Sequence, residues 1–135
     1  MLDERILVAV DGSEASERAV EYVAEMVKGR PGHFVHLVHV LSADEDTAAA
    51  RAMLERLRNR LHAAGMAEDR VDSGALRVRP DVSMTEGLLD TARERSCGTI
   101  VMGRNSLPRH RELFHRHPAD ELVREARGFT LWIVE

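Results

Sequence analysis

The residues best suited to chemistry follow an apolar run that ends at Gly103. The run is Thr99-Ile100-Val101-Met102, and the polar residues Arg104-Asn105-Ser106 come directly after the glycine. A buried strand that ends at a glycine and continues into a polar loop is typical of a binding site. Glycine at such a turn lets backbone N–H groups approach a phosphate closely. This stretch therefore suggests binding of a phosphate or another anion.

The segment from Arg104 to His117 is basic. It holds four arginines against one glutamate, a charge of +3 before any of its three histidines is protonated. One interpretation is a site for an anion or an acidic protein partner, and the other is a solvated surface loop. His115 and His117 lie close in sequence, but no cysteine or carboxylate accompanies them at a known ligand spacing. We therefore predict no metal site.

A second polar turn follows the run Ile6-Leu7-Val8-Ala9-Val10, where Asp11-Gly12-Ser13 comes next. The run lacks polar alternation, which indicates a strand covered on both faces. Ser13 is suited to cap a following helix, with Ser16 or Glu17 placed to complete a capping box. Asp11 has a side chain that can organise the turn between strand and helix.

The elements that must position these turns alternate along the chain. Strands are expected at residues 6–10, 34–41, 71–78, 99–102 and 130–134, each but the last followed by a helix with one apolar face. Pro118 followed by Asp120 and Glu121 indicates the first turn of the last helix. The pattern predicts one α/β domain over residues 1–135, an open five-stranded parallel sheet with helices on both faces.

Composition narrows the function classes. The 135 residues carry a net charge of −4, so nothing draws the whole chain to nucleic acid or to an anionic membrane. The single cysteine, Cys97, excludes an internal disulfide, and we expect it to be a partly buried small residue. No apolar stretch approaches 18 residues, and the first residues do not resemble a signal peptide. We expect a soluble, cytoplasmic protein with no nucleic-acid or membrane partner.

Three segments resemble the universal stress protein family. They are Val8-Ala9-Val10-Asp11-Gly12-Ser13, His39-Val40 and Ile100-Val101-Met102-Gly103, and the resemblance covers essentially the whole chain. It implies the Rossmann-like fold of the adenine nucleotide alpha hydrolase-like class. It also implies that Asp11 matches a position contacting adenosine and Val40 one beside the adenine. The structural alternatives are a turn aspartate at Asp11, a core valine at Val40 and a simple turn glycine at Gly103.

ATP-binding members of that family resemble G-x2-G-x9-G-(S/T) after the fourth strand. Counted from Gly103, the second glycine falls on Ser106, the third on Arg116 and the hydroxyl residue on His117. Larger side chains at these positions restrict the close backbone approach that a phosphate needs. Pro118 offers no N–H, and the charges of Asp120 and Glu121 repel a polyphosphate. The sequence therefore predicts that the usual triphosphate cradle has been lost.

Three functions remain open. The first is a stress-response and regulatory module without a cofactor or catalytic residues, which acts as a homodimer and engages a protein partner. The second is a switch that holds ATP or AMP at Asp11, Val40 and Gly103. Candidate phosphate ligands for it come from the altered loop: Arg104, Ser106, Arg109, Arg116 and His117. The third is a nucleotidyl-transfer enzyme, although the turn from Asp11 to Ser16 lacks the adjacent glycines of that class.

The last strand is the expected dimer contact. An apolar strand at the edge of a sheet is an aggregation hazard, and pairing with its own copy across a two-fold axis removes that hazard. The residues concerned are Thr130, Leu131, Trp132, Ile133 and Val134. A core strand is the alternative interpretation of the same run. His36 and His39, in the second strand, are expected to be tolerated residues near the surface.

Overall fold

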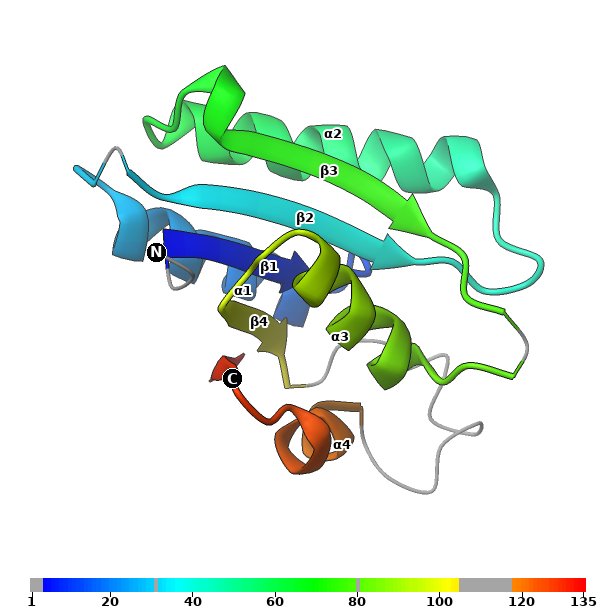
Figure 1. The fold of residues 1–135 in the computed structure, drawn as a ribbon. Coiled ribbons are helices and arrows are strands. Elements are labelled where there is room, and N and C mark those ends of the chain that lie inside the picture. The colour runs from blue at the N-terminus through cyan, green and yellow to red at the C-terminus, as the bar shows by residue number, and fades with distance from the viewer. Residues whose placement is uncertain (1–3, 31, 80, 105–117) are drawn as a thin grey trace.

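Five short apolar segments pair as parallel strands in the computed structural model, which describes residues 4–30, 32–79, 81–104 and 118–135 (Figure 1). The order across the sheet is β3-β2-β1-β4-β5. The strands are β1 (Arg5–Ala9), β2 (Phe34–Val40), β3 (Val71–Leu76), β4 (Thr99–Gly103) and β5 (Thr130–Val134). The predicted α/β class and parallel five-stranded sheet are confirmed.

β3 is shorter than the sequence predicts, because it ends at Leu76 rather than at residue 78. Its one neighbour in the sheet is β2, which itself ends at Val40. The backbone N–H of Leu41 donates to the carbonyl of Leu76 at 2.7 Å, and beyond that bond the described part of the chain offers β3 no strand to pair with. Arg77 then turns to the preceding loop, donating to the carbonyls of Ser42 and Ala43 at 3.2 Å.

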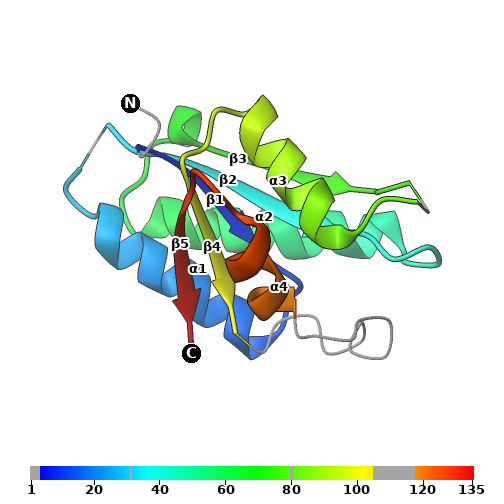
Figure 2. The same cartoon turned by 60° about the horizontal axis from the view of Figure 1, so that its bottom comes forward.

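The helices form one layer on each face of the sheet (Figure 2). The first layer contains α1 (Glu14–Val27) and α2 (Thr47–Ala63), with a short 3₁₀ helix, η2 (Glu68–Arg70), before β3. The second contains α3 (Met84–Glu94) and α4 (Pro118–Glu125). Within the described part of the chain, no helix is long and apolar enough to cross a lipid bilayer.

Polar caps fix where three of the helices begin. The side chains of Ser13, Asp46 and Ser83 each accept a hydrogen bond from a backbone N–H in the first turn of the helix that follows. The expected cap at Ser13 is confirmed, but the capping box is not formed. Ser16 Oγ donates instead to the carbonyl of Ser13 at 3.0 Å, and the N–H of Ser13 donates to Asp11.

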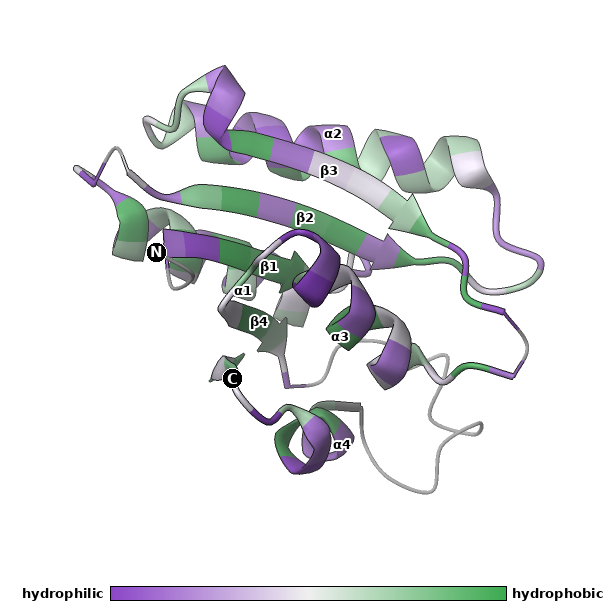
Figure 3. Cartoon of the chain, viewed as in Figure 1, coloured by the Kyte–Doolittle hydropathy of each residue, from purple (hydrophilic) through white to green (hydrophobic). Residues whose placement is uncertain are grey.

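Two hydrophobic clusters, one on each face of the sheet, make up the core. One joins the strands to α1 and α2, and the other joins them to α3 and α4. The central strands are hydrophobic along most of their length because both of their faces are covered (Figure 3).

Candidate functional site

The candidate site lies at the carboxyl end of the sheet, where the order of the strands reverses. β1 and β4 are neighbours in the sheet although β2 and β3 separate them in the sequence. Their register pairs Ala9 with Met102, so the segments that leave β1 and β4 start side by side. Ligands of open α/β sheets bind outside the carboxyl ends of the strands at such a reversal. The structure thus brings the two predicted turns, at Asp11 and at Gly103, to one place.

Asp11 organises the turn that leads from β1 into α1. Its Oδ1 accepts a hydrogen bond of 2.9 Å from the N–H of Ser13, which is an Asx turn. Gly12 between them has φ +83°, a conformation that side-chain-bearing residues rarely adopt, and a Cβ there would also lie 3.4 Å from Met53. The structural role expected for Asp11 is therefore confirmed, and the same turn presents it at the carboxyl end of the sheet.

His39 and Glu45 form a second fixed group at this end. The carbonyl of Val10 lies 2.7 Å from His39 Nδ1, which must therefore be the N–H donor, and Nε2 hydrogen-bonds to Glu45 Oε2. Burial raises the pKa of Glu45, but hydrogen bonds from His39 and Ser42 outweigh that effect and hold the pKa below its ordinary value. Glu45 is thus ionised at neutral pH.

Val40 and Gly103 are placed as the sequence indicates, at the ends of β2 and β4. Val40 is 5% exposed and belongs to the cluster that packs α3 and α4 on the sheet, so it is a core residue at a strand end. Gly103 is buried and pairs with Val134 of β5. Together with Asp11 they form a short row at the carboxyl ends of three adjacent strands, β2, β1 and β4.

Arg104 is turned toward β5. Its backbone N–H donates to the carbonyl of Val134 at 2.8 Å, and its Nη1 lies 3.1 Å from Glu135 Oε1. The Arg104 side chain is 52% exposed and that of Glu135 74%, so this ion pair is open to solvent. The other loop candidates, Ser106, Arg109, Arg116 and His117, lie outside the described residues.

The first turn of α4 is acidic, as the sequence predicts. The helix begins at Pro118, and Asp120 and Glu121 lie in its first turn. Leu122 and Ala119 are buried in the cluster shared with α3, which fixes the helix against the sheet. The end of α4 that would attract an anion through its dipole instead carries two carboxylates and a residue without an N–H.

The expectation that His36 and His39 lie near the surface is wrong, since they are 2% and 3% exposed. A strand covered on both faces leaves no exposed side, so a histidine within it needs a buried partner. Asp72 of β3 supplies that partner for His36, bonding to its Nδ1, and also pairs with Arg95 at 2.7 Å. Burial lowers the pKa of His36, and the hydrogen bond and charge of Asp72 oppose that shift only in part.

Cys97 is more deeply buried than predicted, at 3% exposure. Burial raises the pKa of its thiol, which makes it unreactive at neutral pH. Among the residues that the structure describes, no three histidine, cysteine or carboxylate side chains are grouped to hold a metal ion.

Comparison with known proteins places these features in a family. The model of the universal stress protein family matches residues 4–128. The fold is similar to a universal stress protein family member from Burkholderia pseudomallei, at 22% identity and TM-score 0.73, covering 98% of this chain and 96% of that one. None of the curated proteins matches the sequence.

Two further similar structures contain nucleotides. One is the universal stress protein from Archaeoglobus fulgidus in complex with dAMP, at 22% identity and TM-score 0.70, covering 100% of both chains. The other is a universal stress protein in complex with cAMP, at 21% identity and TM-score 0.75, covering 100% of this chain and 98% of that one.

Proposed function

The chain belongs to the universal stress protein family, and we propose that it is a cytoplasmic, homodimeric regulatory module of the stress response without enzymatic activity. In this proposal it does not hold a nucleoside triphosphate. The observation that carries the proposal is the first turn of α4, which begins at Pro118 and holds Asp120 and Glu121. The family resemblance assigns this turn to the phosphate end of the site. A triphosphate there would meet like charge and one N–H fewer than a helix start normally offers.

The family resemblance assigns Asp11 and Val40 to the adenosine end of the site. They follow or end adjacent strands, β1 and β2, at the carboxyl end of the sheet, and Gly103 ends the neighbouring β4. The dAMP and cAMP complexes of proteins with the same fold favour a second candidate function, a switch that binds a nucleoside monophosphate. A monophosphate extends less far toward α4 than a triphosphate, so the acidic first turn opposes it less.

Homodimerisation through β5 is supported by its position and its residues. β5 lies at one side of the sheet, and among the described strands it pairs with β4 alone (Figure 2). Leu131, Trp132, Ile133 and Val134 are only partly buried in the single chain. Trp132 also meets the exposed Tyr22 of α1 in an edge-to-face contact at 5.8 Å. Such an apolar edge is protected when it pairs with a second copy.

Calorimetric titration with ATP, ADP and AMP, each in the presence of Mg²⁺, tests the ligand proposal. We expect no micromolar binding of ATP, and a micromolar dissociation constant for ATP contradicts the proposal. Micromolar binding of AMP alone supports the monophosphate switch, with the adenosine end used and the triphosphate end lost.

The variant Arg116→Gly separates two explanations if any nucleotide binds. Weaker binding identifies Arg116 as a phosphate ligand, because its guanidinium replaces the missing backbone donors. Stronger binding identifies it as an obstruction at the position where ATP-binding members have a glycine. The exposed Arg127 serves as the matched control, and Arg127→Gly is expected to leave the affinity unchanged.

A further inference from the structure

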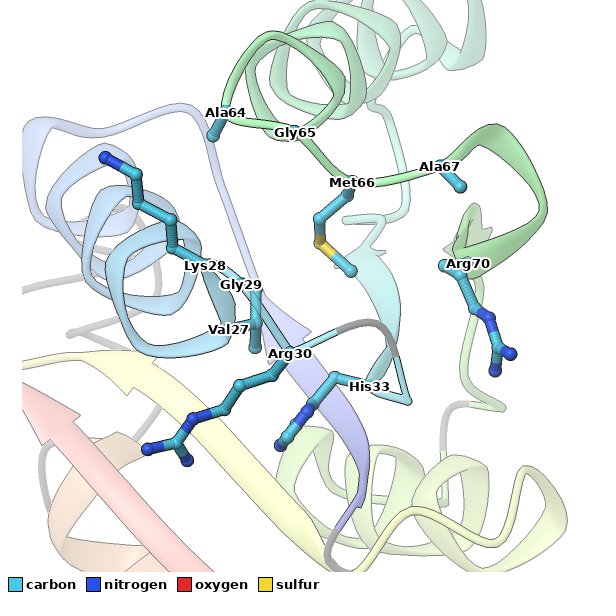
Figure 4. Close-up of a pocket in the computed structure, with 10 residues that line it drawn as sticks. All are labelled: Val27, Lys28, Gly29, Arg30, His33, Ala64, Gly65, Met66, Ala67 and Arg70. Carbon is cyan, nitrogen blue, oxygen red and sulfur yellow. The ribbon is translucent and has the colours of Figure 1, made fainter.

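Two hollows in the surface border α2. The first has a volume of about 350 Å³ and opens between the turns that follow α1 and α2 (Figure 4). Figure 4 shows that the charged ends of Lys28, Arg30 and Arg70 point away from it, so these cations do not assemble an anion site there. The second hollow, of about 420 Å³, lies on the other side of α2, between this helix and β3.

The second hollow lies beside the free edge of β3, an outer strand that pairs with β2 alone among the described strands (Figure 1). Because the N–H of Leu41 donates to the carbonyl of Leu76, the peptide groups of Leu76 and of every second residue before it face β2. Those of Ser73 and Ala75 therefore face away from β2. No other described residue forms a hydrogen bond with these outward N–H and C=O groups. An edge of this kind is a template for a further strand.

The charges of α2 are paired on the side facing α1 and unpaired on the side facing the hollow. Arg56 and Arg60 form ion pairs with glutamates of α1. Arg51 and Glu55, the outer flank of α2, are exposed, line the hollow and form no ion pair with any residue in the described ranges. Arginine precedes glutamate by four residues here, which is the weaker order for a pair within one helix.

An antiparallel second copy of β3 fits the free edge when a two-fold axis passes through Gly74. Ser73 then lies opposite Ala75 of the second copy, and Ala75 lies opposite its Ser73. Since both residues point their peptide groups outward, each of these two pairs can exchange two hydrogen bonds. Gly74 meets its own copy between them, at the position where antiparallel strands approach most closely.

The same axis brings opposite charges together. α2 packs mainly against β3, so the two α2 helices would lie antiparallel on the same face of the joined sheet. Arg51 and Glu55 line the hollow together with residues 73–75, which places them near the axis. Arg51 of each copy is thus directed toward Glu55 of the other, and each charge gains the partner that it lacks within its own chain.

We propose that the free edge of β3 and the outer flank of α2 form a second self-association surface, through which two copies of this chain join their sheets edge to edge. The surface lies at the opposite edge of the sheet from β5. The contact is small and polar, so we expect a dissociation constant of about 0.1–1 mM. At micromolar concentrations it is unpopulated and does not alter the mass of a dimer formed through β5.

Sedimentation equilibrium of Trp132→Glu, which places a carboxylate in the β5 contact, tests the proposal by charge reversal. We expect a monomer–dimer equilibrium in the stated range. Arg51→Glu or Glu55→Arg, each added to Trp132→Glu, should raise the dissociation constant at least about ten-fold, because each puts two pairs of like charges across the axis. An equal mixture of these two variants should restore association, since opposite charges then face one another again. Arg127→Glu, on an exposed arginine outside α2 and β3, is the matched control and should change nothing.

Hydrogen exchange of the unsubstituted protein is a second measurement that does not depend on how Trp132→Glu folds. Exchange of the Ser73 and Ala75 amides should slow as the protein concentration rises toward about 1 mM. Pairing through β5 leaves these amides open, because β5 lies at the other edge of the sheet.

Three results each overturn the proposal. They are a folded Trp132→Glu protein that stays monomeric to about 1 mM, association that neither charge reversal weakens, and exchange at Ser73 and Ala75 that does not depend on concentration. The free edge of β3 would then be left for a strand of another protein. If Trp132→Glu does not fold, the exchange measurement decides alone.

Discussion

In the β1–β2 half of the sheet's carboxyl end, hydrogen bonds hold the side chains at the strand ends, whereas the β4–β5 half is held mainly by backbone pairing. Asp11 is fixed by Ser13, and His39 is fixed between Val10 and Glu45. In the other half, Gly103 has no side chain, and the Arg104 side chain forms an ion pair with Glu135 that is open to solvent.

The two halves correspond to the two parts of a nucleotide, adenosine and phosphate, that the family resemblance assigns to them. The half that would contact adenosine keeps a rigid, hydrogen-bonded edge, and the half that would contact phosphate has lost the small residues and gained acids on α4. In the proposed function, the chain keeps one end of this site and has replaced the other. The following experiments test how far the two halves differ.

The largest effect is expected at the outer side of the β4–β5 half, where Trp132→Glu should convert a dimer to a monomer. A carboxylate at this position enters a two-fold interface twice and must be desolvated in both copies. We expect the dimer dissociation constant to rise by at least about 100-fold. Light scattering after size exclusion measures the change in mass.

Tyr22→Glu is a milder variant on the adjacent helix, where the ring is already 44% exposed and folding is not at risk. It is expected to weaken the dimer in the same direction. Val123→Glu, on an exposed position of α4, is the control and should leave the mass unchanged. A dimer that persists in both Trp132→Glu and Tyr22→Glu, or a monomeric parent protein, contradicts assembly through β5.

The next effect concerns the β1–β2 half, where Glu45→Ala should lower the free energy of unfolding by about 2 kcal/mol. The substitution leaves Nε2 of the buried His39 without its hydrogen-bond partner, and Ser42 loses its bonds to the same carboxylate. Chemical denaturation measures the loss. Asp44→Ala, an exposed carboxylate in the same loop, is the matched control, expected to change stability by less than about 0.5 kcal/mol.

The same pair gives the protein a pH dependence with a defined sign. The pKa of Glu45 in the folded protein lies below the ordinary value of 4.5. Its stabilising contribution is therefore complete above pH 4.5 and is lost as the pH falls through the folded pKa. Glu45→Ala should remove this part of the acid destabilisation. Identical acid transitions in the variant and the parent protein would show that Glu45 does not contribute in this way.

A smaller effect is expected from Asp72→Asn, which changes the residue of β3 that bonds to His36 of β2. The pKa of His36 already lies below 6.5 because of burial, and Asp72 raises it while Arg95 and Arg5 lower it. Removing the carboxylate charge should lower this pKa further, which an NMR titration of the ring signals measures. We expect a loss of stability of about 0.5–1 kcal/mol, limited by the partial exposure of Asp72.

The pH dependence of stability that His36 causes is opposite in sign to the one caused by an ion pair that keeps a histidine charged. His36 binds its proton at a lower pH in the folded protein than in the unfolded chain, so its contribution to stability is complete above pH 6.5 and falls as the pH drops below it. Asp72→Asn should extend this fall to lower pH. Asp81→Asn, an exposed aspartate, is the control. An unchanged or raised pKa in Asp72→Asn means that Asp72 does not support the protonated form of His36.

Most of the fold could be predicted from the sequence because its signals are local and repeated. Apolar runs without alternation predict strands covered on both faces, and the caps and glycines between them mark where helices begin and end. The positions of Asp11 and Gly103 followed from the same pattern, since strand ends in a parallel sheet meet on one side.

The partners of the buried histidines could not be predicted, because they depend on strand order and register. His36 meets Asp72 only because β2 and β3 pair in a register that places these two residues opposite one another. His39 meets Glu45 only because the loop after β2 folds back over the strand end. The sequence did carry one usable signal, since a histidine in a doubly covered strand has no exposed side and requires a buried partner.

The smallest effect returns to the β4–β5 half, at Arg104→Gln. An ion pair between two exposed side chains is screened by water and salt, so we expect stability to change by less than about 0.5 kcal/mol. Chemical denaturation at low and high salt measures this, with Arg93→Gln, which breaks an exposed ion pair within α3, as the control.

The Arg104→Gln variant also sharpens the functional comparison. If the parent protein binds a nucleotide and Arg104→Gln weakens that binding ten-fold or more while stability is unchanged, Arg104 leaves Glu135 to contact phosphate, and the β4–β5 half still serves the ligand. Equal affinities in the two proteins show that Arg104 does not contact the nucleotide.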